Sequence, residues 1–552
     1  MSKKSGYAIF SGIMVFFFFF CFTGAHLAKE GNIIWGGRYV LVLLGLCLIC
    51  GMVAGVALTH VMGLLKKDVH LEKRSRAVKA GLVSWLLFAL AYLPTYLAYY
   101  PGICSYDITI QLEQVASGNY IDHHPLAHTL LVEAFLELGT FLGNTNLGMG
   151  LYTLLQMICL SGVMALGMGM LYAKGISSGY LIVVQLLGML LPVNWYMSVS
   201  ATKDIFFTAF VLLMMFSLYA LLSGAGKRDT WKIGRWDALF AVALVGVMLF
   251  RNNGKYAYLV FFIFGALTCI FAKKNKKLFR RIWLVGLAGF LVGNLCLSVL
   301  FRVTDATQGD KREMLSIPIQ QLARTYVYHG GIGVVEEDDN TLDEASKELL
   351  NAFFANEAYR DYRPDIADPV KKHTQTSVAL QRAGEWIGMY LGLLVKYPGD
   401  YINAVLAVDA GFVYPFDTSH GDINFNGRDR GLGYIQTRWV ENELNPMGIY
   451  KDSRWEGLHE MLEDFADTNA YQDIPVLKYL MMPGCYLWFY LLFAGYLLWK
   501  RKYRMLLPLS FVLGYYLTLL LGPTVQLRYL YPVMVLLPYG LLFSTGEQIS
   551  EE

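Results

Sequence analysis

The chain has 552 residues, of which 55% are hydrophobic and 16% are charged, and it carries a formal net charge of +3. Soluble domains carry about 25% charged residues, so this composition excludes an ordinary soluble protein and predicts an all-α polytopic membrane protein. The small net charge gives no indication of a nucleic-acid partner. Most of the eight cysteines lie in apolar runs, so no disulfide framework is expected.

Apolar segments long enough to cross a membrane follow one another along most of the chain. A helix needs about 20 apolar residues to span the hydrocarbon core. Twelve segments approach this length: residues 7–25, 39–64, 80–99, 147–171, 177–198, 204–223, 237–250, 255–272, 282–301, 476–499, 505–521 and 527–545. The first could be a cleaved signal peptide, but its length favours an uncleaved anchor. We therefore expect about twelve transmembrane helices.

Lysine and arginine are concentrated in four loops, residues 65–79, 224–236, 273–281 and 500–504. Such loops remain on the cytoplasmic side of membrane proteins. With the N-terminus inside, the twelve expected spans place all four loops and both termini in the cytoplasm. The extracytoplasmic side then receives the loop 100–146, the short turns near residues 203, 251 and 528, and the long segment 302–475.

This topology divides the chain into four parts. They are the N-terminal helices and basic loop (1–79), a transmembrane module with the outer loop (80–301), an extracytoplasmic domain (302–475), and the last three helices (476–552). Within the third part, the patterning is helix-like at 342–359 and 376–397 and loop-like at 410–436. Residues 385–398 have an amphipathic pattern typical of a helix on the membrane surface.

Acidic residues and histidines are concentrated in residues 99–129, which contain no lysine or arginine. Asp107 follows a Pro-Gly turn just after an expected span, which places it at the outer mouth of the membrane domain. A carboxylate there could act as a general base if burial raised its pKa, or as a helix N-cap. Gln111 lies one turn further along the same helix face and could be its hydrogen-bonding partner.

Asp122, His123 and His124 form a second group of candidates in the same loop. His124 and His128 are four residues apart, so both could face one ligand, and a divalent cation is a candidate. The HExxH signature of zinc proteases is absent. The alternatives are substrate contact by these side chains, or a solvated loop in front of a helix that begins near Pro125.

Cations at the outer ends of the expected spans form a third group. Lys203, Arg251 and Arg528 are unusual there because the positive-inside bias disfavours such positions. Snorkelling toward the headgroups is one interpretation, and binding of a phosphate or diphosphate on a lipid-linked substrate is the other. Asp204 and Asn252 lie beside these cations and are included as candidate substrate-binding residues.

Residues 422–427 match the first half of an EF-hand calcium loop. The bidentate glutamate required at position twelve is replaced by Gly433, and nearby arginines would oppose a cation. A loop rich in glycine and asparagine is the expected interpretation.

The arrangement YPG…SYD…Q…HP in the first large outer loop resembles membrane glycosyltransferases of the GT-C superfamily. The Lys203-Asp204 turn, the Arg251-Asn-Asn-Gly turn and the late Leu-Arg-Tyr segment resemble an uncharacterised bacterial branch of that superfamily. The resemblance covers roughly residues 85–300 and 475–545. It implies a GT-C-like fold, Asp107 as the acidic residue of the outer loop that acts as general base, and Arg528 as the basic residue that holds the donor phosphate. Tyr106 stands where a second acid would be, so metal dependence stays open.

The resemblance implies transfer of a sugar from a polyprenyl-phosphate donor to a cell-envelope glycan, lipid or protein at the extracytoplasmic membrane face. A lipid-linked polysaccharide polymerase or ligase would share this outer-face chemistry. A transporter or flippase of envelope lipid is the alternative from another class, and it predicts polar groups along a path through the bilayer. Such groups are few between the two faces, which favours an enzyme.

Overall fold

The computed structural model describes residues 2–33, 36–63, 74–105, 107–223, 229–310, 312, 315–416, 430–436 and 447–545. Within these ranges every named element is a helix, and the β-type contacts are isolated bridges. The expected all-α fold is therefore confirmed. The EF-hand-like run 422–427 lies outside the described residues.

In the described part of the chain, eight helical segments are long and apolar enough to cross a membrane. They are α1 (Lys3–Glu30), α2 (Gly37–Gly63), α3 (Arg74–Ala98), α6 (Thr145–Ala173), α9 (Lys203–Ser223), α11 (Asn252–Phe271), α12 (Lys276–Val303), and the C-terminal segment Leu527–Ser544, which comprises α25 (Leu527–Leu536), η8 (Leu537–Gly540) and α26 (Leu541–Ser544). Apolar helices of this length and number make the chain a polytopic membrane protein.

Two bent pairs raise the number of spans to as many as ten. The pair α7 (Ser178–Leu190) and α8 (Pro192–Val199) bends by 53°, and the pair α22 (Pro475–Met481) and α23 (Pro483–Trp499) bends by 76°. A proline begins the second helix of each pair, because proline lacks the N–H that would continue the first.

The count of twelve spans is not reached among the described residues. The two remaining predicted spans fall on α10 (Arg235–Phe250) and α24 (Leu506–Leu519), which have 16 and 14 residues. Helices of that length are shorter than the hydrocarbon core. All twelve predicted segments therefore coincide with a helix or a bent pair, but only eight to ten have the length and composition of a span.

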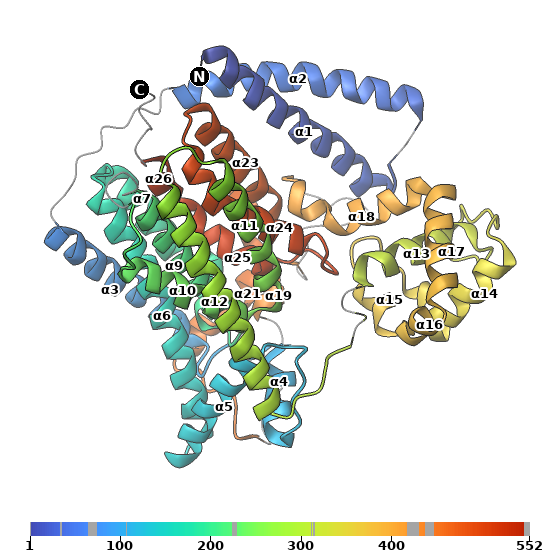
Figure 1. Cartoon of the computed structure of the whole chain (residues 1–552). Helices are drawn as coiled ribbons and strands as arrows, with labels where there is room; N and C mark the ends of the chain where they lie inside the picture. The colour runs from blue at the N-terminus through green and yellow to red at the C-terminus, as the bar shows by residue number, and fades with distance from the viewer. Residues whose placement is uncertain are drawn as a thin grey trace.

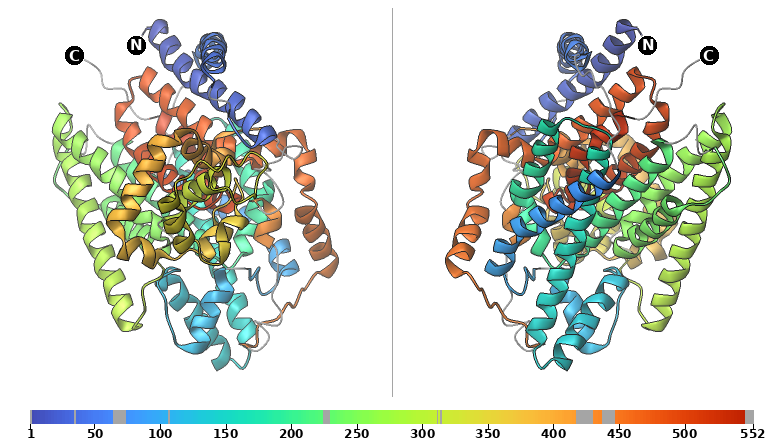
Figure 2. Two further views of the ribbon diagram at one scale, coloured as in Figure 1. Left: turned by 90° about the vertical axis from the view of Figure 1, so that its right-hand side faces the viewer. Right: turned by 90° about the vertical axis from the view of Figure 1, so that its left-hand side faces the viewer.

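Helix α9 runs through the centre of the bundle, and 89% of its most apolar 18-residue stretch is buried inside the protein. It packs against α6, α10 and α25 (Figure 1). Helix α3 crosses the outside of the bundle and packs against α6 (Figure 2, right). Because α9 is buried on all sides, the polar residues at its first turn face protein rather than lipid.

The two ends of the bundle differ. Trp499 donates a hydrogen bond to the Ser2 carbonyl (3.2 Å), and Lys502 donates one to the Ser544 carbonyl. Residues near both termini, together with the basic turn that contains η7 (Tyr503–Met505), therefore share one end. Helices α4 (Asp107–Ser117) and α5 (Leu126–Phe141), which belong to the segment 100–146, lie at the opposite end (Figure 1).

Part of the segment 302–475 forms a unit beside the bundle, which we call the side unit, residues 315–401 (Figure 1; Figure 2, left). It has its own apolar core, which includes Ile319, Leu350 and Phe353. Its helices are α13 (Ser316–His329), α14 (Glu344–Phe353), η3 (Ala355–Asp361), α15 (Asp368–Lys372), α16 (Thr376–Gln381) and α17 (Ala383–Lys396). Helices therefore occupy the stretches predicted at 342–359 and 376–397.

The rest of that segment packs into the transmembrane bundle, so 302–475 is not one unit. Helix α18 (Pro398–Val413) packs against α1 and α23. Helices α19 (Leu432–Gln436) and α21 (Glu456–Asp467) contribute Ile435 and Leu462 to the apolar core of the helix bundle, and η6 (Ala470–Asp473) contributes Tyr471 to it. The stretch predicted as loop-like, 410–436, thus contains the end of α18 and all of α19.

Candidate active site

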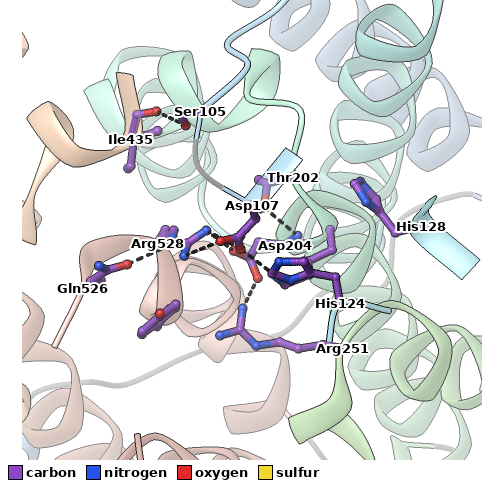
Figure 3. Close-up of polar contacts among 12 residues, drawn as sticks. Ser105, Asp107, His124, His128, Thr202, Asp204, Arg251, Ile435, Gln526 and Arg528 are labelled. Atoms are coloured by element: carbon purple, nitrogen blue, oxygen red, sulfur yellow. Dashed lines mark hydrogen bonds and ion pairs between the residues drawn. The ribbon is translucent and has the colours of Figure 1, made fainter. Parts of the chain in front are cut away.

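Asp107 lies between two cations that come from distant parts of the chain (Figure 3). Its Oδ2 atom is 2.7 Å from Lys203 Nζ and 2.9 Å from Arg528 Nη1. All three side chains are largely buried. Each residue stands at the first turn of its helix, α4, α9 or α25, so three helix starts meet at one point.

A second ion pair joins this group. Arg251 pairs with Asp204, and both side chains are buried. Arg528 Nη1 lies 3.9 Å from Asp204 Oδ2, which links the two pairs into one cluster. Both arginines also lie over the ring of Tyr529, at 5.0 Å for Arg251 and 5.1 Å for Arg528. Contact of a guanidinium with an aromatic face compensates part of its lost hydration.

The cluster of these five side chains carries an excess of positive charge. Three cations, Lys203, Arg251 and Arg528, face two carboxylates, Asp107 and Asp204, among the residues described at this site. A buried charge without a partner is costly. The cluster is therefore suited to an anionic ligand with one negative charge.

Burial alone would raise the pKa of the Asp107 carboxyl, but Arg528 and Lys203 outweigh that effect and hold the pKa well below its usual range. The condition stated for a general base, a pKa raised by burial, is therefore not met in this arrangement of the site. The physical reason is that two cations share the same carboxylate oxygen, and each favours its ionised form. Asp107 is ionised here but weakly basic.

His124 borders the cluster. Its Nδ1 atom is 3.0 Å from Lys203 Nζ, and the residue is 4% exposed. Burial and the neighbouring Lys203 charge lower the pKa of His124 to about 3, so the ring is neutral. The exposed ring of His123 packs edge-on against it, with ring centroids 4.6 Å apart.

Gln111 and His128 lie away from the cations, inside the contact between α4 and α5. Gln111 Oε1 is 2.9 Å from His128 Nδ1, and its amide donates to Thr129 Oγ1 at 2.7 Å. His128 Nε2 is 2.6 Å from the Tyr152 hydroxyl. Gln111 thus braces the two helices instead of facing a ligand, and His124 and His128 do not converge on one site.

The possible divalent cation has no evident set of ligands in the described part of the chain. No group of three or more histidine, cysteine, aspartate or glutamate side chains there is placed to hold a metal ion. The side chains of Asp122, His123, His124 and His128 therefore do not come together as a metal-binding group.

Asp122 and Asn252 stand at the rim and hold the loop that carries His124. Asp122 Oδ1 accepts a hydrogen bond from the Gly309 amide (2.6 Å). Asn252 donates to the Asp122 carbonyl at 3.3 Å. These two hydrogen bonds support the loop.

Three residues at the site were missed by the sequence reasoning. Gln526 Oε1 accepts from Arg528 Nε at 2.9 Å, and the Tyr434 and Tyr529 rings lie 5.2 Å and 5.1 Å from the Arg528 guanidinium. Gln526 and Tyr529 flank Arg528 in the sequence and could have been found there. Tyr434 is far from Arg528 along the chain, so only the fold brings it to the site.

Comparison with curated proteins and with solved structures finds no match to this chain. The model of DUF6020, described as a family of unknown function, matches residues 116–551. That range contains His124, Lys203, Arg251 and Arg528, whereas Asp107 precedes it. Because the match covers most of the sequence, the chain belongs to the DUF6020 family.

Proposed function

We propose that this protein is a GT-C-type glycosyltransferase that moves a sugar from a polyprenyl-phosphate donor to a cell-envelope glycan, lipid or protein. The reaction would take place at the extracytoplasmic face of the cell membrane, with both termini in the cytoplasm. The observation that carries the proposal is the buried cluster in which Asp107 shares its carboxylate with Lys203 and Arg528 while one positive charge stays in excess.

The charge of the cluster favours a phosphate ligand. Arginine binds phosphate oxygens through parallel N–H donors, and such charge-assisted bonds are about twice as strong as neutral ones. Arg528 and Lys203 both lie at helix starts, next to each other and at one end of the bundle. A lipid-linked phosphate can reach such a position from the bilayer while its polyprenyl chain stays in the hydrocarbon region.

The chemistry follows from these roles. The acceptor hydroxyl oxygen forms a bond to the anomeric carbon as the bond between that carbon and the phosphate oxygen breaks. The bonding electron pair leaves on the lipid phosphate, where Arg528, Lys203 and Arg251 stabilise the added negative charge. The hydroxyl proton passes to the Asp107 carboxylate.

Donor binding also makes Asp107 a better base. A phosphate that takes Arg528 and Lys203 as partners competes with the carboxylate that holds them in the structure. Once these contacts weaken, the two cations no longer depress the pKa of Asp107, and burial raises it. The base would thus gain strength only when the donor is present.

The test is transfer of radiolabelled sugar by the purified protein in lipid nanodiscs, with a panel of polyprenyl-phosphate sugars and envelope acceptors. Asp107→Asn should lower transfer by about 10²–10⁴-fold, the usual contribution of a general base. Glu137→Gln is the matched control, because Glu137 is an exposed carboxylate on α5 in the same outer loop.

Asp107→Asn should not lower the affinity for the lipid phosphate, since it removes the carboxylate that competes for Arg528 and Lys203. Near-normal transfer by Asp107→Asn would exclude Asp107 as the base. No transfer from any donor of the panel by the wild-type protein would contradict the glycosyltransferase proposal itself.

A further inference from the structure

We propose that His124 binds the donor as a neutral hydrogen-bond donor, through Nε2–H to a phosphoryl oxygen, and that the site is built for a single phosphate group rather than a diphosphate. This inference rests on the proposed function for the nature of the ligand. It goes further by assigning a role to one atom and by choosing between two classes of lipid-linked donor.

The tautomer of His124 follows from its contact with Lys203. The lysine ammonium group has three donors and no acceptor. Its Nζ lies 3.0 Å from His124 Nδ1 and 2.7 Å from Asp107 Oδ2. Nδ1 must therefore accept, and in a neutral ring the proton then sits on Nε2.

That Nε2–H group has no partner among the described residues, although the atom is buried. A buried donor without an acceptor costs about 1–3 kcal/mol, and buried polar groups in native proteins are rarely left so. The ring lies beside the Asp107–Arg528 pair, whereas the ring of His128 lies apart from it (Figure 3). The free donor thus belongs to the same site as the cations that would hold a phosphate.

The positive charge that attracts anions to the site also keeps the His124 ring neutral. The ring is buried and stands next to the Lys203 ammonium, so a second positive charge on the ring would be repelled. His124 therefore adds a directional contact without adding charge. The cluster therefore keeps one excess positive charge, because three cations, Lys203, Arg251 and Arg528, face the two carboxylates of Asp107 and Asp204.

One excess charge selects between the two common linkages of lipid-bound sugars. A sugar on a lipid monophosphate is a phosphodiester with one negative charge, and it neutralises the cluster. A sugar on a lipid diphosphate carries two negative charges, so one would stay uncompensated in a buried site. The described side chains of the cluster supply no further cation for it.

Two substitutions of His124 distinguish the contribution of Nδ1 from that of Nε2. The Asn side chain places its polar atoms near Nδ1, and the Gln side chain places its amide near Nε2. His124→Asn therefore keeps an acceptor for Lys203 and removes the donor to the ligand, while His124→Gln keeps a donor near Nε2. His60→Asn, on an exposed position of α2, is the matched control.

The probes are tritiated farnesyl methyl phosphate, a diester with one charge, and farnesyl methyl diphosphate, which has two. Equilibrium binding is measured on the full chain in nanodiscs, and thermal unfolding of each variant confirms that it is folded. We expect the wild-type protein to bind the monophosphate diester more tightly than the diphosphate. His124→Asn should weaken monophosphate binding by about 10-fold or more, the usual value of a hydrogen bond to a charged group. His124→Gln should stay within about threefold of the wild type.

Equal loss in both variants, or no loss in His124→Asn, would overturn the assigned donor. Tighter binding of the diphosphate would overturn the choice of linkage. These outcomes are distinct from failure of the proposed function, because binding is measured without sugar transfer. A protein that binds the probes as expected but transfers no sugar would contradict the glycosyltransferase proposal and leave this inference standing.

Discussion

At the scale of single residues, the site depends on ionic contacts that share partners. Asp107 is bound by two cations, and Arg528 lies near two carboxylates. Removal of one charge therefore changes the balance for several neighbours, and single substitutions will not be additive. The effect of a substitution depends on which charges it leaves without a partner.

The Asp204–Arg251 pair provides a direct test of this coupling. Asp204→Asn should destabilise the protein by about 3–5 kcal/mol, because it leaves the buried Arg251 without its carboxylate. Arg251→Gln should cost less, since Asp204 keeps Arg528 at 3.9 Å. The double variant should be more stable than Asp204→Asn alone. Thermal unfolding in nanodiscs measures all three, and strictly additive losses would contradict the coupling.

Protonation of buried histidines should make the protein less stable in acid. Burial, followed by the charge of Lys203, lowers the pKa of both His124 and His128 to about 3. An unfolded chain takes up these protons as the pH falls below about 6.5, whereas the folded protein does so only near pH 3. Stability is therefore lost as the pH falls from about 6.5 toward 3, by about 1.4 kcal/mol per unit for each ring.

The measurement is the unfolding temperature between pH 6.5 and 5 for the wild type and for His128→Asn, which should show a shallower decline. His329 does not disturb this window. Burial lowers its pKa, but hydrogen bonds to Asp400 and Asp339 outweigh that effect and raise it. The stability from a raised pKa is fully present below the unfolded value and is lost only as the pH rises. An unchanged decline in His128→Asn would show that His128 is not one of the responsible groups.

At the scale of elements, the site is made where helices begin or break. Helix α10 ends next to Arg251, and α11 begins at Asn252, so the arginine stands at the break between two packed helices. Gly254 permits this close approach, because a Cβ atom there would clash with the Val247 carbonyl oxygen of α10. Close packing at the break therefore sets the position of Arg251.

Gly254→Ala should destabilise the protein by about 1–3 kcal/mol, the usual cost of overpacking, and should weaken binding of the monophosphate probe by displacing Arg251. Gly388→Ala on α17 is the control, because nothing lies within 4 Å of its added Cβ and alanine favours a helix. Thermal unfolding and probe binding are measured together. Equal effects of the two substitutions would contradict the role of the close contact.

At the scale of the whole molecule, the side unit is attached to both sides of the site. The segment that precedes it in the chain contacts the His124 loop, since the Thr307 amide donates to the Tyr120 carbonyl at 2.9 Å. Its other attachment is near Arg528, where the Ala367 amide donates to the Pro523 carbonyl at 2.8 Å. These two contacts join the unit to segments that border the cluster on both sides.

The topology can be tested by cysteine labelling in a cysteine-free background. Single cysteines at Asn119 and Glu357 should react with an impermeant maleimide from outside intact cells, and those at Ser75 and Lys276 only after permeabilisation. All four positions are exposed. Labelling of Asn119 and Lys276 from the same side would overturn the orientation and the extracytoplasmic location of the site.

The sequence by itself determined the class of the protein and the general location of its candidate site. Hydropathy identified every segment that forms a long apolar helix, because the helix is the structure that satisfies backbone hydrogen bonds in a bilayer. In the predicted topology, loop charges put Asp107, Lys203, Arg251 and Arg528 on one side of the membrane, and the fold brings these four together.

Only the tertiary structure decided how these residues act on one another. Gln111 and His128 bond to each other instead of facing the cations, and Asp107 has a lowered pKa instead of a raised one. The division of 302–475 between two cores was also not readable from the local patterning. The reason is common to all three: pKa values, hydrogen-bond partners and core membership depend on distances between residues far apart in the chain, and local periodicity contains no information about them.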